Sequence, residues 1–552
     1  MRSPGPVVWM AIIALVVLVA IPLAFIVLQA VFPQLGQGSL AQPFSRFLTV
    51  LSDEALLRMT LNTILLGAGV VLCSAVLAVP LGVLRALFKV PFAPLWDILL
   101  LVPFMIPPYI ATLGWIMMLQ PRGYLTQLVG FDAAPFLFSL YGVIFVMTLG
   151  AFPVVYFAVS RTVEAIGGRF ADVGRVFGAP PLVAFRRITL PLAAPGLAAS
   201  LLLVFAMTIE EYGTPAALGR QSGFEVLVTG IDTRVADWPI DLPGAAILSL
   251  LLVLLSLGAF MIQLRILSRR SFATVGGKPQ AVVKRPLGVF AIPVVLLFAL
   301  AAFLSVGVPL FAIYITAMSK TLSGGLALDN LGFAHFAAIA QDEGGALQAL
   351  FNSLSLGVAT ALITGIVGAA AAYSVVRTQF RGKGILDALT VIPNAIPGIV
   401  VAVGLILAWN QPWLPFTPYN TPLILLMAYC CILLPYTVRY ANAAFRQVGD
   451  NLEAAARVCG ARPLTAFRRI LLPLVLPSLI SAMLLVFAVA TRELVASVLV
   501  APVGMSTIST FIWRQFEQGS VGLGMAMSAI TILITTTIPL AVTLFSGRKG
   551  LM

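Results

Sequence analysis

The chain has 552 residues, of which 60% are hydrophobic and only 10% are charged, and its mean hydropathy is +1.06. This composition excludes a soluble globular protein of this length. The formal net charge of +13 would suit a nucleic-acid partner, but its distribution along the chain predicts membrane topology instead, with no nucleic-acid binding.

Apolar runs of about 20 residues recur along the chain, and each is long enough to cross the roughly 30 Å hydrocarbon core of a bilayer as a helix. The first run has no small-residue cleavage site after it, so we expect a retained helix and not a signal peptide. The pattern predicts an all-α polytopic membrane protein with about twelve spans. They cover about residues 8–32, 58–86, 96–120, 139–163, 192–211, 243–266, 287–317, 348–376, 385–409, 421–443, 474–491 and 521–545.

An even number of spans places both termini on the same side of the membrane. With the termini in the cytoplasm, 25 basic and 6 acidic residues lie inside (+19), and 8 basic and 14 acidic residues lie outside (−6). The positive-inside rule therefore predicts a multi-pass membrane protein with both termini in the cytoplasm.

The chain is a tandem duplication. Residues 175–195 (RVFGAPPLVAFRRITLPLAAP) and 457–477 (RVCGARPLTAFRRILLPLVLP) are identical at 15 of 21 positions without a gap. Further identical pairs at an offset of 290 are Asn62/Asn352, Gly67/Gly357, Asp97/Asp387, Pro103/Pro393, Ile106-Pro107/Ile396-Pro397 and Gly114/Gly404. The predicted domains are residues 1–267 and 287–552, joined by a basic cytoplasmic linker at 268–286. Two six-span repeats of the same orientation predict a pseudo-two-fold axis along the membrane normal and a shared pathway.

The most similar segment lies in a basic loop before the fifth span of each repeat, at about 167–191 and 449–473. Its central Gly178 or Gly460 predicts a helix–turn–helix with a tight turn. The Leu-Pro at its end predicts the point where the chain re-enters the membrane. Phe185 and Phe467 are candidate knobs for a groove on a partner. A plain basic connector is the alternative, but connectors normally vary more than the elements they join.

This loop resembles the cytoplasmic EAA loop of the membrane subunits of binding-protein-dependent ABC importers. Gly178 and Gly460 take the position of its glycine, and Ile188-Thr189-Leu190-Pro191 and Ile470-Leu471-Leu472-Pro473 supply its exit. The opening departs from the pattern, with Asp172-Val173-Gly174 in one copy and Glu453 before three alanines in the other. The resemblance implies that residues 172–188 and 454–470 form coupling helices that dock on ATPase subunits. The residues to which it assigns this role are Asp172, Gly178, Ala179, Phe185, Arg186, Glu453, Gly460, Ala461, Phe467 and Arg468.

The resemblance also implies a location in the bacterial cytoplasmic (inner) membrane and three kinds of partner: two copies of a cytoplasmic ABC ATPase, an extracytoplasmic solute-binding protein and membrane lipid. ATP and Mg²⁺ belong to the ATPase, because this chain has no G-x-x-x-x-G-K-[ST] motif. His335 is the sole histidine, and the four cysteines lack CxxC spacing. We therefore expect no cofactor, no catalytic residues and no enzymatic activity in this subunit.

Unusual charges and prolines suggest the pathway. Glu210, Glu211 and Tyr212 follow the fifth span of the first repeat, and Arg492 and Glu493 follow that of the second. Ionised groups near hydrocarbon usually face a cavity or a partner, although anchors just past the helix ends are an equal alternative. Pro107 and Pro397 break the third span at matching depth, which points to a translocation path.

The segments EEYGTPAALG (210–219) and Arg492-Glu493-Leu494 resemble fused two-unit permeases of the ferric-iron type. Carboxylates suit a hard cation such as Fe³⁺, so Glu211 and Glu493 are candidate metal contacts, with no metal site assigned firmly. Importers of phosphonate, thiamine or polyamine remain alternatives. An ion-gradient-driven secondary transporter with two six-span repeats is the alternative of another class, but it would need titratable groups inside its spans.

Overall fold

The structure is a computed structural model that describes residues 5–166, 178, 180, 183, 185–268, 284–461 and 463–549. In these residues, nine helices are long and apolar enough to cross a bilayer, two further helix pairs are broken spans, and Val521–Thr537 is a shorter apolar helix. Together they lie where the twelve spans were predicted, which confirms the all-α polytopic fold.

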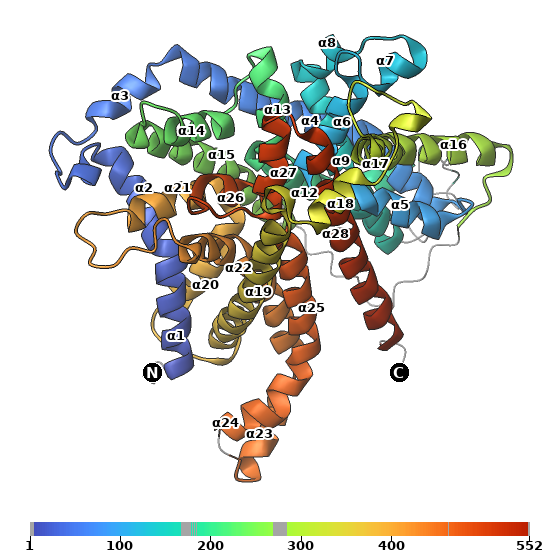
Figure 1. Cartoon of the computed structure of the whole chain (residues 1–552). Helices are drawn as coiled ribbons and strands as arrows, with labels where there is room; N and C mark the ends of the chain where they lie inside the picture. The colour runs from blue at the N-terminus through green and yellow to red at the C-terminus, as the bar shows by residue number, and fades with distance from the viewer. Residues whose placement is uncertain are drawn as a thin grey trace. The chain divides into compact units, whose positions relative to one another are not determined.

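The chain divides into two compact units that are not the two sequence repeats (Figure 1). Unit 1 contains Met1–Asp53, Ile231–Val253 and Ala334–Met552, and unit 2 contains Glu54–Gly230 and Leu254–Phe333. Unit 1 includes α1 (Pro6–Leu15), α2 (Ile21–Val31), α3 (Ser45–Leu51), α18 (Ala334–Ala340), α19 (Ala346–Arg377), α20 (Lys383–Val391), α21 (Gly398–Trp409), α22 (Pro422–Gln447), α23 (Asp450–Val458), α24 (Pro463–Ala466), α25 (Leu472–Ala490), α26 (Val495–Val500), α27 (Ile508–Glu517) and α28 (Val521–Lys549). Unit 2 includes α4 (Glu54–Leu87), α5 (Ala93–Met105), α6 (Pro108–Leu119), α7 (Tyr124–Val129), α8 (Ala134–Leu137), α9 (Leu140–Ile166), α12 (Leu190–Glu210), α13 (Gly213–Ser222), α16 (Ala291–Ala302) and α17 (Val308–Met318). The two remaining helices, α14 (Leu227–Ala236) and α15 (Leu242–Ser268), each belong partly to both units.

The first span of each repeat packs in the unit built mainly from the other repeat. In unit 1, α1 and α2 contact α19 and α21, and in unit 2, α16 and α17 contact α5 and α6. The contact points correspond, because a Cβ on Gly404 would lie 2.8 Å from the carbonyl oxygen of Pro22, and one on Gly114 would lie 2.8 Å from that of Pro309. The predicted domain boundaries thus describe the duplication, while the packing exchanges the first spans.

Four π-helical turns recur at equivalent places in the two repeats. They are η1 (Val16–Ala20), η5 (Phe303–Gly307), η3 (Phe185–Thr189) and η9 (Phe467–Leu471). Each ends two residues before a proline, namely Pro22, Pro309, Pro191 and Pro473. A proline ring clashes with the carbonyl four residues earlier and offers no N–H, so a locally widened turn lets the helix continue.

The third span is broken in both repeats, as the prolines predict. Helices α5 and α6 are bent by 96°, and α20 with its short 3₁₀ extension Ile392–Ala395 is bent by 117° from α21. Ile106 and Ile396 at the breaks have extended ψ angles of 130° and 121°. Proline disfavours the helical conformation of the residue before it, and the backbone leaves the helix at Ile106 and Ile396, directly before Pro107 and Pro397.

Candidate coupling and translocation sites

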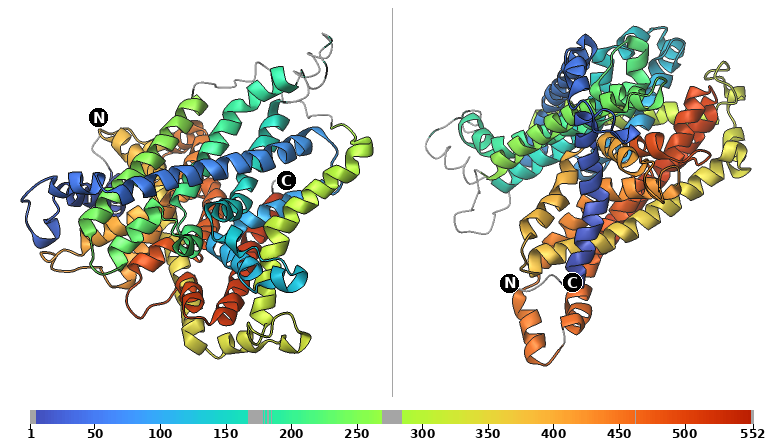
Figure 2. Two further views of the ribbon diagram at one scale, coloured as in Figure 1. Left: turned by 90° about the horizontal axis from the view of Figure 1, so that it is seen from above. Right: turned by 90° about the vertical axis from the view of Figure 1, so that its left-hand side faces the viewer.

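The second basic loop forms the predicted helix–turn–helix, built from α23 and the α24–η9 segment. This hairpin projects beyond the ends of α19 and α22 within unit 1 (Figure 1), and the right-hand view of Figure 2 shows it at the bottom (orange). The N–H of Ala461 donates to the carbonyl of Ala456 at 2.9 Å, and that of Cys459 to Ala455 at 3.0 Å. These bonds close the C-terminus of α23 in the manner of a Schellman motif.

The two central glycines adopt the same left-handed conformation. Their φ angles are +83° at Gly178 and +81° at Gly460, and no atom of the described residues lies within 4 Å of a Cβ built on either. Backbone conformation, and not lack of space, therefore requires glycine at both positions. The prediction of a tight turn at each glycine is confirmed.

The ring of Phe467 packs partly inward, and its predicted role as a knob for a partner stays a prediction. The ring lies 5.3 Å from that of Tyr373 in a T-shaped arrangement and is half-buried against the core around Phe445. Among the hairpin residues whose side chains are described, the large apolar ones that are exposed are Leu452 (48%) and Val458 (89%). Sequence reasoning missed them, although the aligned positions 170 and 176 are also apolar, as phenylalanine and valine.

The other predicted coupling residues are described only in part. Asp172 and Ala179 lie outside the described residues, and for Phe185 and Glu453 only the helical backbone is described. Arg186 and Arg468 are exposed on the π-helical turns η3 and η9. The basic side chains next to the projecting turn are thus available to a partner.

Glu211 and Glu493 occupy equivalent positions, and each accepts a hydrogen bond from a backbone N–H three residues later in the chain. A Glu211 carboxylate oxygen accepts the N–H of Thr214 at 2.9 Å, and one of Glu493 accepts the N–H of Ala496 at 3.3 Å. Each acid therefore satisfies a free N–H at the start of the short helix that follows the fifth span, α13 or α26. This geometry supports the helix-end alternative rather than a free carboxylate mouth.

Burial raises the pKa of both carboxyl groups. Surrounding protein desolvates the partly exposed Glu211 side chain and raises its pKa to about 7, and the same effect raises the pKa of Glu493. Backbone hydrogen bonds oppose the shift at both positions. The described residues hold no group of three or more His, Cys, Asp or Glu side chains able to bind a metal ion.

Each short helix also joins the half-span that follows the proline break. In unit 2, the hydroxyl groups of Thr214 (α13) and Thr112 (α6) are hydrogen-bonded at 2.8 Å. In unit 1, α26 packs on α21. The Ser497 hydroxyl of α26 also lies 2.6 Å from the Tyr429 hydroxyl on α22. The structure thus brings the two candidate path features, the acidic turn and the proline-broken span, together within each unit.

The remaining path candidates differ between the repeats. Glu210 accepts a hydrogen bond from the Ser256 hydroxyl at 2.8 Å, and the ring of Tyr212 is buried. Arg492, at the position aligned with Glu210, is half-buried in unit 1. The duplicated sites therefore share their helix-capping acids but not the residue before them.

Comparison with known proteins agrees with the duplicated architecture. The family described as "Binding-protein-dependent transport system inner membrane component" matches twice, at residues 78–272 and 361–550. Both matches begin after the first span of a repeat, so the exchanged spans lie outside them. The basic loop, the broken third span and the acidic turn lie inside.

Two of the similar proteins align with most of the chain. The ferric transport system permease protein FbpB of Actinobacillus pleuropneumoniae is 27% identical over 503 residues, which cover 89% of this chain and 71% of that protein. The Fe(3+)-transport system permease protein FbpB 2 of Haemophilus influenzae is 22% identical over 96% of this chain and 97% of its own length. The putative 2-aminoethylphosphonate transport system permease protein PhnV of Salmonella paratyphi A is 27% identical but covers 38% of this chain.

The two family matches account for most of the chain, and each contains one copy of the loop with its left-handed glycine, one broken span and one capping acid. The chain therefore belongs to the family of inner membrane components of binding-protein-dependent transport systems, as a permease that carries both family units in one polypeptide.

Proposed function

We propose that this permease supplies both halves of the pathway of an ATP-driven importer, with one ABC ATPase subunit docked on each basic loop. The observation that carries the proposal is the projecting hairpin of α23 and α24, whose left-handed glycine recurs in the other repeat. Leu452 and Val458 are exposed on this hairpin, and a docked ATPase would bury them.

The cargo we propose is ferric iron, delivered by an extracytoplasmic solute-binding protein. Relatives similar over most of this chain are described as ferric permeases, whereas the phosphonate relative covers only part of it. Glu211 and Glu493 already accept helix N–H groups, so we assign primary cargo recognition to the binding protein and not to these carboxylates.

Reconstitution tests this function. Proteoliposomes that contain the permease, its ATPase and a ferric-loaded binding protein are expected to accumulate iron only when ATP is supplied. Excess 2-aminoethylphosphonate, thiamine or polyamine, each with its own loaded binding protein, is expected not to be taken up. Iron uptake that needs neither ATP nor the ATPase, and stops when an ion gradient is collapsed, would instead identify a secondary transporter.

The orientation predicts where one native cysteine reacts. Cys459 is exposed beside Gly460 in the hairpin, whereas Cys430 and Cys431 are buried and Cys73 lies on a membrane-spanning helix. A membrane-impermeant maleimide is expected to label Cys459 in inside-out vesicles and not in intact spheroplasts, with Cys459→Ser as the unlabelled control. Labelling in spheroplasts alone would reverse the topology.

The exposed apolar end of α23 predicts a docking contact. Val458→Ser is expected to weaken ATPase binding about tenfold, since burying a valine side chain contributes about 1.5 kcal/mol. Binding of purified ATPase to the permease in nanodiscs measures the effect. Val503→Ser is the matched control, because Val503 is 92% exposed on a turn in another part of unit 1. Equal weakening by both substitutions would contradict a specific contact at Val458.

A further inference from the structure

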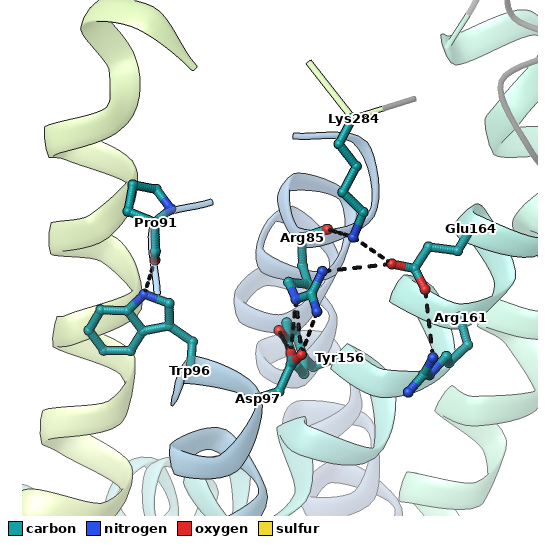
Figure 3. A network of polar contacts seen from close by, with 8 residues as sticks. All are labelled: Arg85, Pro91, Trp96, Asp97, Tyr156, Arg161, Glu164 and Lys284. Carbon is teal, nitrogen blue, oxygen red and sulfur yellow. Dashed lines mark hydrogen bonds and ion pairs between the residues drawn. The ribbon is translucent and has the colours of Figure 1, made fainter. Parts of the chain in front are cut away.

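The described end of the linker is attached to the helix that leads into the first basic loop. The Lys284 ammonium donates to a Glu164 carboxylate oxygen at 2.8 Å and to the carbonyl of Arg85 at 3.0 Å (Figure 3). Glu164 lies two residues before the end of α9, the helix that precedes this loop. Arg285 adds a backbone bond to Leu87 at 3.0 Å. The linker thus joins the ends of α4 and α9.

Arg85 extends the network to the broken third span. Its guanidinium contacts both carboxylate oxygens of Asp97 on α5, the shortest contact being 2.6 Å, and lies 3.7 Å from Glu164 (Figure 3). The Tyr156 hydroxyl donates to the same Asp97 carboxylate at 2.7 Å. A continuous series of polar contacts therefore runs from the linker, through the base of the loop, to the helix that leads to the break at Pro107.

These contacts are better protected from water than ordinary surface ion pairs. The side chains of Arg85, Glu164 and Lys284 are 18%, 26% and 27% exposed, whereas that of Arg161, which also approaches Glu164 at 3.8 Å, is 82% exposed. Partial burial weakens solvent screening, and exposed pairs contribute little. The exposed contact of Arg161 with Glu164 can therefore serve as a control for the partly buried contacts of Arg85 and Lys284.

In the second repeat, the corresponding helix end, that of α22, is held by different contacts. The position aligned with Glu164 is Arg446, so an acidic partner is missing there. Instead, Arg377 at the end of α19 donates to the carbonyls of Phe445, at 2.8 Å, and Val448. These carbonyls end α22, directly before α23 of the hairpin, where a cation is favourable. In each repeat, an arginine from the second span holds the end of the fourth span.

We propose that Arg85 and Arg377 are positioning residues for the two coupling loops, and that Lys284 makes the linker part of the first of these attachments. The proposal rests on the ATPase docking proposed above. Displacement of the first loop is passed through Glu164 and Arg85 to Asp97, and hence to the broken span, while the second loop acts through backbone carbonyls. The two repeats are therefore coupled to their ATPase subunits by non-equivalent contacts.

The test compares stimulation of ATP hydrolysis in the reconstituted complex. Lys284→Met is expected to leave ATPase co-purification and the rate without binding protein unchanged, but to lower the stimulation by loaded binding protein about fivefold. Lys284→Arg, which keeps the charge and the reach to Glu164, is expected to restore it. Arg161→Gln is the matched control and is expected to behave as the wild type.

A double substitution distinguishes a shared contact from two separate ones. Lys284→Met with Glu164→Gln is expected to be no worse than Lys284→Met alone, because both remove the same ion pair. Full stimulation in Lys284→Met, or loss of ATPase co-purification in parallel with loss of stimulation, would overturn the positioning role. Failure of the wild-type complex to bind the ATPase would instead overturn the proposed function.

Discussion

Replacing Gly178 and Gly460 together by valine is expected to abolish stimulated ATP hydrolysis and iron uptake. Both glycines have φ angles near +80°, a region that costs a residue with a Cβ roughly 1–2 kcal/mol and a β-branched residue more. Each substitution therefore lowers the fraction of correctly shaped loops about tenfold or more. Because each loop is proposed to dock one ATPase, the two losses combine.

Asparagine provides the control for that experiment. Gly178→Asn with Gly460→Asn adds a side chain of similar size but tolerates the left-handed conformation, and within the described part of the chain no atom lies within 4 Å of either Cβ position. We expect this variant to retain most of its co-purification with the ATPase and most of its uptake. If valine and asparagine variants were equally impaired, a steric contact with the partner, and not backbone conformation, would explain the glycines.

Gly404→Ala and Gly114→Ala are each expected to lower the free energy of unfolding by about 1–3 kcal/mol, the usual cost of overpacking. The added Cβ would lie 2.8 Å from a backbone oxygen, that of Pro22 or Pro309, and backbone atoms move only if the whole first span moves. Each substitution thus tests whether the first spans pack on α21 and α6 as the structure shows.

Thermal unfolding of the detergent-purified permease measures the change. Gly258→Ala is the matched control, because Gly258 also lies inside a membrane-spanning helix but has no atom within 4 Å of its Cβ position. We expect this substitution to be neutral or stabilising. Unchanged stability in Gly404→Ala and Gly114→Ala would contradict the exchanged packing.

Features that depend on local sequence were predicted well. The spans follow from the apolar runs, the breaks at Pro107 and Pro397 from prolines at matching depth, which disfavour helix in the residue before them, and the turns at Gly178 and Gly460 from the repeated motif. The short helices after the fifth spans were not predicted, because six to ten residues leave little periodic signal. Their capping acids, Glu211 and Glu493, were noticed as unusual charges, with a place on the pathway and an anchor past the helix end as equal alternatives, but helix capping was not predicted.

The sequence by itself determined the membrane class, the duplication and the loop that marks the family, since hydropathy, repeat identity and backbone constraints at proline and glycine are local properties. The tertiary structure decided the exchange of first spans, the inward packing of Phe467 and the attachment of Lys284 to Glu164. These depend on contacts between residues far apart in the chain, 120 positions for Lys284 and Glu164 and 382 (404 − 22) for Gly404 and Pro22. Apolar spans resemble one another on every face, so only their packing selects which neighbour each one takes.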